Sequence, residues 1–534
     1  MEQHSLWLIT LLMLLYVHEI LSANQPNIIF VIADDMGWHD VGFHGSDMLT
    51  PNIDKLAYEG VILNNYYVSP ICSPTRSAIM TGRHPIHTGM QHEVIGNDTP
   101  YGLPLNFTIM PQYLKALGYD THAVGKWHLG HFKKEYLPTL RGFDSFFGYL
   151  TGHEDYFDHV AEGSPYWGKD FRNNTDPVAT MDGDYSTELY TSLAENIIST
   201  HNQSKPLFLY LAYQAVHAGN SQADPLQAPQ KYIDRFPNIT NIPRKIFGGM
   251  VSALDDGIGN LRSVLEKTGM MNNTVLVFTT DNGGPTNGYD RNAACNWPLR
   301  GCKNTMWEGG VRGNGFVHSP LLRKTGYIMD NLMHITDWLP TIYSLAGGNA
   351  SDLPNQDGYN VWNMLSDDGQ PIRTSVLHNI DPIQNFAAIR VGEYKLVMGD
   401  ISNGRDDSWY PPPDLKKNHH KLRFNDKQLN NFKGDKFTYR MSSEKMSKPI
   451  TVNCGKRPVD ADTNCLPKSK PCLFHIPTDP CEFTNIAYQH PEIVAELYQK
   501  IEEYKKTMVP PGNKPADPKG ANPYNHGGFW GPWM

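Results

Sequence analysis

The chain has 534 residues, a length that favours one large and one smaller domain over a single minimal core. Hydrophobic residues make up 40% and charged residues 19% of the chain, which describes a globular protein and excludes a disordered one. The formal net charge is -9. This balance does not indicate the basic face that nucleic-acid binding requires, so no nucleic-acid partner is expected.

The N-terminus is typical of a secretory signal. Residues 6–17 form an apolar run that is too short to span a bilayer of roughly 30 Å, and Leu21-Ser22-Ala23 follows as a cleavage site. We therefore predict a signal peptide over residues 1–23. The leader lacks a basic residue, which leaves a membrane anchor as the alternative. No later segment is long and apolar enough for stable membrane insertion, so the protein is expected in the secretory pathway, either extracellular or lysosomal.

Glycosylation sequons agree with secretion. Seven asparagines begin an N-x-S/T triplet without a central proline. These candidate sites are Asn97, Asn106, Asn173, Asn202, Asn238, Asn272 and Asn349. Together with the signal sequence, they predict a glycoprotein.

Seven cysteines in an oxidising compartment leave at least one without a disulfide partner. Six of them lie in close sequence pairs, and the simplest pairing is Cys295 with Cys302, Cys454 with Cys465, and Cys472 with Cys481. Other connectivities of six cysteines stay open. Cys72 stands alone, far from the others in sequence, and is therefore the candidate for chemistry.

Three apolar runs predict strands that are buried on both faces of a parallel sheet. They are Asn27–Ala33, Leu207–Tyr213 and Thr274–Thr279. Each run leads into polar residues, namely Asp34-Asp35, His217 and Asp281-Asn282-Gly283-Gly284. Because active sites of open α/β sheets lie at the carboxyl ends of the strands, we expect these side chains to meet there.

The remaining periodicities complete the domain prediction. Met110–Leu117 and Phe247–Thr268 carry apolar residues at helical spacing, so residues 24–385 are predicted to form an α/β catalytic domain. Ala387–Met398 is typical of a hairpin, and Pro491–Thr507 is typical of an amphipathic helix. Between them, residues 400–470 are polar and predict surface loops. Residues 386–534 are therefore predicted to form a C-terminal subdomain with a small antiparallel sheet and a helix.

The motif Cys72-Ser73-Pro74-Thr75-Arg76, followed by Thr81-Gly82-Arg83, resembles the signature of the type I sulfatases. Further segments resemble this family, in particular the branch around arylsulfatase B (N-acetylgalactosamine-4-sulfatase) and its insect and other animal relatives. They are Asp34–Trp38, Gly125–Gly130, Asp281–Gly284, Trp307–Arg312 and Trp530–Met534. The resemblance covers most of the mature chain. It implies an alkaline-phosphatase-like α/β fold, with a mixed sheet flanked by helices and a smaller C-terminal α+β domain.

The resemblance also implies a reaction. A formylglycine-generating enzyme would oxidise Cys72, and the hydrated aldehyde has two hydroxyls on one carbon. One hydroxyl attacks the sulfur of a sulfate ester to give a covalent sulfo-enzyme intermediate, and loss of the proton from the other expels sulfate. A serine has one hydroxyl and lacks this second step.

A metal site of oxygen ligands is implied as well. Asp34, Asp35, Asp281 and Asn282 would bind the ion, and an oxygen of the modified Cys72 would complete the site. Hard oxygen donors favour Ca²⁺ over zinc.

Basic residues at family positions would stabilise the charge of the sulfate and of the leaving oxygen; they are Arg76, Lys126, His128, His217 and Lys303. Arg76 would hold the formylglycine diol, while Lys126 and Lys303 would bind the sulfate oxygens. His217 would protonate the leaving alcohol, and His128 would act as the base that regenerates the aldehyde. The helix after the motif, from about Ser77 to Thr81, would point its amides at the sulfate.

The resemblance to the family is weaker among the residues that would contact the rest of the substrate. His153 is a further candidate for a polar substrate contact, beside Lys126, His217 and Lys303. Residues 218–223 resemble an insertion after His217, and Cys302 is an additional cysteine beside Lys303. The substrate is therefore either a sulfated glycan of the N-acetylgalactosamine-4-sulfate type or a small organic sulfate such as an aryl sulfate or a glucosinolate.

The same residues argue against two alternatives to a sulfatase. A phosphodiesterase of the same superfamily would be expected to have a serine or threonine nucleophile and two zinc ions, whereas this chain has Cys72 and Asp/Asn ligands. A non-catalytic protein that binds sulfated glycans would be expected to have lost Cys72 or a metal ligand, and all of them are present.

Overall fold

A computed structural model describes residues 25–163, 165–220, 224–399, 402–413 and 449–534. The predicted signal peptide, the middle of the predicted loop region and the end of the predicted insertion lie outside the described residues. Within the described ranges, no helix combines the length and the apolarity that crossing a membrane requires.

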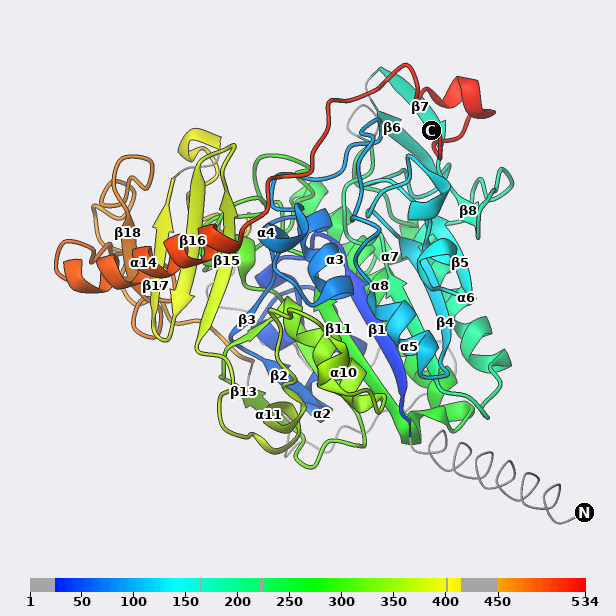
Figure 1. The fold of residues 1–534 in the computed structure, drawn as a ribbon, viewed down its shortest axis with the longest axis horizontal. Coiled ribbons are helices and arrows are strands. Elements are labelled where there is room, and N and C mark those ends of the chain that lie inside the picture. The colour runs from blue at the N-terminus through cyan, green and yellow to red at the C-terminus, as the bar shows by residue number, and fades with distance from the viewer. Residues whose placement is uncertain (1–24, 164, 221–223, 400–401, 414–448) are drawn as a thin grey trace, which may run out of the picture.

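A mixed sheet of ten strands, counted over the described residues, forms the centre of the molecule (Figure 1). Its strand order is β13-β2-β12-β11-β1-β10-β4-β5-β8-β9. The four central strands are parallel: β11 (Thr274–Thr280), β1 (Asn27–Ala33), β10 (Leu207–Ala212) and β4 (Asp120–Lys126). The others are β2 (Val61–Leu63), β5 (Ser145–Tyr149), β8 (Arg172–Asn173), β9 (Asp176–Pro177), β12 (Gly315–His318) and β13 (Tyr327–Met329). All three predicted strands are present, and the predicted mixed α/β sheet is confirmed.

Side chains of β1 alternate between two hydrophobic layers. Ile28, Phe30 and Ile32 pack into the layer that contains α3 (Cys72–Thr81), α5 (Met110–Ala116) and α10 (Trp338–Leu345). Ile29, Val31 and Ala33 pack into the opposite layer, which contains α2 (Pro51–Glu59), α6 (Ser186–Thr200) and α8 (Ile242–Lys267). This burial on both faces explains why β1 is apolar at successive positions.

Two helices begin earlier than the sequence predicted. Helix α8 starts at Ile242, five residues before the apolar periodicity, because Asn241 caps it by accepting a hydrogen bond from the Arg244 amide. Helix α3 starts at Cys72 instead of Ser77. The remaining short elements are α4 (Pro85–Thr88), α7 (Gln230–Ile233), α9 (Glu308–Val311), α11 (Trp362–Asp367), β3 (Tyr66–Tyr67), β6 (Val160–Gly163), β7 (Tyr166–Lys169) and β14 (Met333–His334).

A second, antiparallel sheet follows towards the C-terminus. It consists of β15 (Ser375–Asp381), β16 (Phe386–Val391), β17 (Tyr394–Met398) and β18 (Cys472–His475). The predicted hairpin is its β16–β17 pair, and the predicted helix is α14 (Pro491–Thr507), which packs on the sheet through Leu497 and Ile501 (Figure 1). Strand β15 precedes residue 385, so the sheet begins before the predicted domain boundary; the division into domains stays a prediction.

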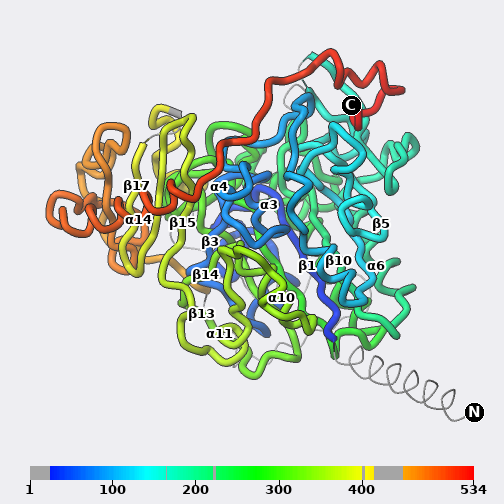
Figure 2. Tube along the Cα trace, in the orientation of Figure 1, coloured from blue at the N-terminus to red at the C-terminus, as the bar shows by residue number. Residues whose placement is uncertain are grey.

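The last residues run back from the small sheet to the larger domain (Figure 2). Trp530 donates from its amide to the Lys169 carbonyl at 2.9 Å and from its indole nitrogen to the Ala161 carbonyl at 2.9 Å. The C-terminal segment thus packs against the β6–β7 hairpin instead of staying with the small sheet.

The predicted disulfide pairing is wrong. The structure pairs Cys454 with Cys481 and Cys465 with Cys472, with Cα atoms 5.5 and 5.7 Å apart. Cys295 and Cys302 are both buried thiols without a disulfide. Pairing requires a short Cα separation in space, and sequence proximity does not establish it.

Three histidines are buried where the small sheet meets the main domain. His84 lies before α4, His334 lies in β14, and His378 lies in β15. Burial lowers the pKa of His84 from 6.5 to about 4, and it lowers the pKa of His334 and His378 well below the ordinary value. The charges of Lys395 and Arg390 lower the pKa of His378 further.

We expect the contribution of these three histidines to the free energy of unfolding to decrease as the pH falls from about 6.5 towards 4. In that window the unfolded chain binds protons that the folded histidines do not, so acid favours unfolding. His378→Leu should flatten the decrease by up to about 1.4 kcal/mol per pH unit. Urea unfolding between pH 7 and 5 measures this slope. The partly exposed His490→Leu serves as control, and equal slopes in both variants would contradict the prediction.

Candidate active site

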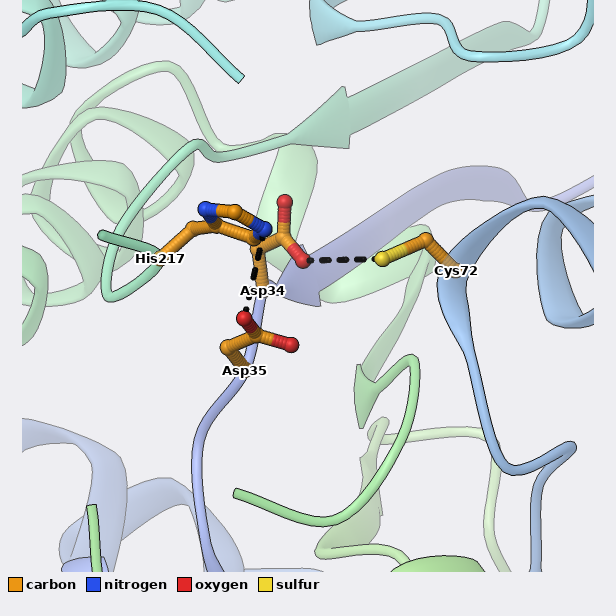
Figure 3. Close-up of side chains that lie close together, drawn as sticks. All are labelled: Asp34, Asp35, Cys72 and His217. Carbon is orange, nitrogen blue, oxygen red and sulfur yellow. Dashed lines mark hydrogen bonds and ion pairs between the residues drawn. The ribbon is translucent and has the colours of Figure 1, made fainter. Parts of the chain in front are cut away.

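The predicted site residues meet at one edge of the central sheet. Asp34 and Asp35 follow β1 directly, Asp281 and Asn282 follow β11, and His217 lies in the loop after β10. Figure 3 shows Asp34, Asp35, Cys72 and His217 pointing toward one another. Lys126 is the last residue of β4, a strand that the sequence analysis missed because Thr121 and His122 interrupt its apolar pattern. Parallel strands place their carboxyl ends together, which explains the convergence.

Cys72 occupies the first turn of α3. Its side chain is buried, it has no disulfide partner, and Sγ lies 3.8 Å from Asp34 Oδ1. Burial raises the pKa of the thiol, while the charges of Lys126 and Lys303 act in the opposite direction. The helix begins at Cys72, so the amides of Cys72 and Ser73 have no carbonyl partner earlier in the helix, and such helix starts favour anions.

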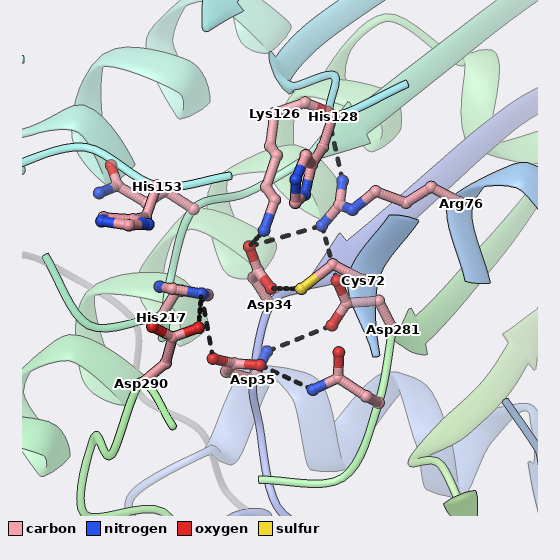
Figure 4. Close-up of polar contacts among 12 residues, drawn as sticks. Asp34, Asp35, Cys72, Arg76, Lys126, His128, His153, His217, Asp281 and Asp290 are labelled. Carbon is pink, nitrogen blue, oxygen red and sulfur yellow. Dashed lines mark hydrogen bonds and ion pairs between the residues drawn. The ribbon is translucent and has the colours of Figure 1, made fainter. Parts of the chain in front are cut away.

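One group of buried charges surrounds Asp34 (Figure 4). Lys126 Nζ donates to Asp34 Oδ2 at 2.6 Å. Arg76 donates to Asp281 Oδ2 at 2.9 Å and lies 3.5 Å from Asp34 Oδ2. Burial alone would raise the pKa of Asp34, but Lys126, His217 and Arg76 together hold it below its ordinary value. Asp34 therefore stays an anion, and the two cations are held in place by it.

A second group joins Asp35, Lys303, His217 and Asp290. Lys303 Nζ donates to Asp35 Oδ2 and to Asp290 Oδ2, each at 2.8 Å, and lies 3.2 Å from His217 Nε2. His217 donates from Nδ1 to the Ala218 carbonyl at 2.6 Å, and its Nε2 lies 3.3 Å from both carboxylates. Burial would lower the pKa of His217, but Asp35 and the other carboxylates raise it well above its ordinary value. The ring is thus an imidazolium that can give up the Nε2 proton.

Asp290 is not among the site residues that the sequence predicts. It lies in the loop after β11, among glycine and asparagine residues that are typical of a turn. No local pattern distinguishes its carboxylate from a solvated one. Only its contacts with Lys303 and His217 identify it as part of the site.

His128 and His153 face the same site as neutral rings. His128 donates from Nε2 to the Ile95 carbonyl at 3.0 Å, which leaves the Nδ1 lone pair available. Burial, and to a smaller extent the charge of Lys126, lowers the pKa of His128 well below its ordinary value. His153 stacks on His217 with ring centroids 5.6 Å apart, and burial lowers its pKa to about 4. A buried neutral imidazole with a free lone pair is suited to act as a base.

The donor set fits a hard cation. One ligand atom each of Asp34, Asp35, Cys72 and His217 lie within 4.8 Å of one another. Asn282 donates from Nδ2 to Asp35 Oδ1 at 2.6 Å, whereas its buried Oδ1 has no hydrogen-bond partner among the described residues. A buried amide oxygen without a donor beside carboxylates is the ligand arrangement that calcium prefers.

Cys72, His128, His217 and Lys303 line a cavity of about 260 Å³. Its lining consists of Cys72, Val94–Asp98, His128, Gly152, His153, Glu162, Gly163, His217, Tyr289, Asp290 and Lys303. His153, which the sequence could place only as a candidate, therefore lies in the pocket wall.

Six of the seven sequon asparagines are exposed: Asn106, Asn173, Asn202, Asn238, Asn272 and Asn349. Asn97 differs, because it lines the cavity and donates from Nδ2 to the Glu162 carbonyl at 2.8 Å. A glycan on that nitrogen would have to find room at the cavity beside this bond. Glycosylation stays a prediction, which the structure makes less favourable at Asn97 than at the other six.

Comparisons with known proteins indicate the family. A family model described as Sulfatase matches residues 26–348. The chain is 42% identical to arylsulfatase J of Mus musculus over 531 residues, which covers 96% of this chain and 80% of that protein. It is 33% identical to N-acetylgalactosamine-6-sulfatase of Mus musculus over 343 residues, which covers 60% of this chain and 62% of that protein.

Among solved structures, Ps i-CgsB in complex with k-i-k-neocarrahexaose is similar, with a TM-score of 0.71 and 27% identity. The similarity covers 94% of this chain and 98% of that one. The resemblance inferred from the Cys72 motif is confirmed. The chain belongs to the sulfatase family and is a sulfuric ester hydrolase of the arylsulfatase type.

Proposed function

We propose that this sulfatase acts through a formylglycine made from Cys72 by the formylglycine-generating enzyme, together with a bound calcium ion. The observation that carries the proposal is the position of Cys72. Its Sγ, which stands where an oxygen of the converted residue would be, faces Asp34 at 3.8 Å in a cavity that Lys303 also lines. The secretory pathway, with either extracellular or lysosomal delivery, is the compartment that this maturation implies.

The two absent groups would supply complementary chemistry. Hydrated formylglycine supplies one hydroxyl for attack on sulfur and a second hydroxyl for release of sulfate. Asp34, Asp35, Asp281 and Asn282 would hold calcium, which supplies a fixed positive charge to the sulfate oxygens.

The chain's own residues bind and move protons. Lys126 and Lys303, held by Asp34 and Asp35, bind the sulfate oxygens, and Arg76 orients residue 72. His217 gives its Nε2 proton to the leaving oxygen, because its Nδ1 is held by the Ala218 carbonyl. His128 takes a proton at Nδ1, because its Nε2 proton is held by the Ile95 carbonyl.

A sulfated sugar is the preferred substrate class, and a small organic sulfate is the second. One relative is named N-acetylgalactosamine-6-sulfatase, and Ps i-CgsB was solved in complex with k-i-k-neocarrahexaose. These names favour a glycan for this chain, whereas the 42% identity to an arylsulfatase also supports small aryl sulfates.

The proposed function is tested by sulfate release from three substrates: a GalNAc-4-sulfated oligosaccharide, a glucosinolate and a simple aryl sulfate. Wild type should release sulfate from at least one of them, and Cys72→Ala should release none. Mass spectrometry of the Cys72 peptide should show formylglycine. Activity with an unconverted cysteine would contradict the proposed mechanism, and the preferred substrate decides between glycan and small molecule.

A further inference from the structure

Asp290 and Tyr289 line the cavity, and each contacts a group to which the proposed function gives a role in the reaction. Asp290 is 14% exposed in its side chain and binds Lys303 and His217, the groups that the proposed function assigns to the sulfate and to the leaving oxygen. Figure 4 shows its carboxylate beside the His217 ring. Tyr289 is 59% exposed and also lines the cavity. The pair is therefore adjacent both to the reacting groups and to solvent.

We infer that Asp290 and Tyr289 form a leaving-group wall that selects the alcohol by charge and by ring stacking. The Asp290 carboxylate accepts a hydrogen bond from a hydroxyl or ammonium group close to the sulfated position, and it repels an alcohol that carries a carboxylate or a second sulfate there. The Tyr289 ring offers a face to a sugar or aryl ring. This inference rests on the proposed function, because it assigns the substrate class of the same site.

The inferred selection by charge follows from the charges around Asp290. Lys303 and His217 are each shared between two carboxylates, Asp35 and Asp290. When a bound sulfate accepts hydrogen bonds from Lys303, the Asp290 oxygens receive fewer of them. A hydrogen-bond donor on the alcohol part of the substrate then replaces the lost bond to Asp290. An anion in the same place meets an uncompensated like charge, which is how binding sites exclude wrong partners.

Two further acidic residues, Asp98 and Glu162, line the same cavity as Lys303 and His217. A substrate with one negative charge at the sulfate and a neutral or cationic alcohol suits this combination of charges.

The inferred selection by ring stacking depends on Tyr289. Its ring centroid lies 5.8 Å from Lys303 Nζ, so the ring is fixed beside the catalytic ammonium while much of its surface stays open. Exposed aromatic faces at a pocket are suited to stack on flat or ring-shaped ligands.

Three phenyl sulfates that differ at the meta position test the charge selection: aminomethyl, hydroxymethyl and carboxyl. Wild type should show the highest kcat/KM for the ammonium compound and the lowest for the carboxylate, with a ratio of about tenfold or more. Asp290→Asn should reduce that ratio about tenfold, and Asp290→Glu should retain the order. Because the ratio compares two substrates on one protein, partial loss of folded enzyme does not change it.

Asp367→Asn is the matched control, since Asp367 forms a surface ion pair with Arg323 at 2.7 Å and its replacement removes the same charge. Its ratio should equal that of wild type. If Asp290→Asn keeps the wild-type ratio, the inference is overturned while the proposed function stands. If wild type carries formylglycine at residue 72 and hydrolyses none of the three compounds or the proposed substrates, the proposed function itself fails.

Variants of Tyr289 test the inferred ring stacking. Tyr289→Ala should raise KM for all three compounds several-fold with a smaller effect on kcat, and Tyr289→Phe, which keeps the ring, should give a smaller rise. Tyr488→Ala, at a tyrosine that is 92% exposed and outside the cavity lining, should leave KM unchanged. Equal KM values for Tyr289→Ala and wild type would overturn the assignment of Tyr289.

Discussion

Cys72→Ser should release at most one equivalent of alcohol per enzyme molecule and then stop. Serine offers one hydroxyl for attack on sulfur, and Lys126, Lys303 and His217 remain in place to assist that attack. The resulting serine sulfate has no second hydroxyl on the same carbon to expel it. Steady-state turnover should therefore fall about ten-thousand-fold or more relative to wild type.

A pre-steady-state assay with a chromogenic aryl sulfate measures this result, and intact mass spectrometry should detect the sulfated protein. Cys72→Ala is the matched control, because it removes the nucleophile without offering a hydroxyl. Continuous turnover by Cys72→Ser would show that a second hydroxyl on residue 72 is not needed. That outcome would remove the reason for formylglycine in the proposed mechanism.

Lys395→Met should lower the free energy of unfolding by about 3–5 kcal/mol. Lys395 lies in β17, is fully buried, and binds Glu308 and Glu482 at 2.9 Å each. Burial already raises the pKa of Glu482 to about 7, with Lys395 acting in the opposite direction. Removal of the ammonium leaves two buried carboxylates close together without their shared ion-pair partner, although Glu308 keeps a nearby cation, Arg312 at 3.8 Å.

Urea unfolding followed by circular dichroism measures the change. Lys505→Met is the control, because its ion pair with Glu502 at 2.8 Å is on the surface, and such pairs contribute little. A triple variant, Lys395→Met with Glu308→Gln and Glu482→Gln, should recover part of the lost stability, since the uncompensated charges are gone. A Lys395→Met protein as stable as Lys505→Met would contradict the prediction.

This cluster also explains how the small sheet is attached to the main domain. Glu308 begins α9 next to the central sheet, whereas Lys395 belongs to the small sheet and Glu482 follows Cys481. Tyr67 donates to the other oxygen of Glu308 at 2.9 Å. None of these residues belongs to a shared local pattern, so their contact could not be read from the chain.

Much of the active site was predictable from the chain because it depends on local features. The apolar runs 27–33, 207–213 and 274–279 indicated parallel strands, and the polar residues directly after them had to lie at the same edge. The motif at Cys72 then indicated the family, which the comparisons confirm.

What the sequence by itself determined, therefore, was the class of fold, the family and the edge of the sheet where Asp34, Cys72 and His217 meet. Only the tertiary structure decided the Cys454–Cys481 and Cys465–Cys472 pairing and the place of Asp290 beside Lys303. The physical reason is the range of the interaction. Strand burial and helix capping depend on neighbouring residues, whereas disulfides and ion pairs between loops depend on which distant segments the packed core brings within a few ångströms.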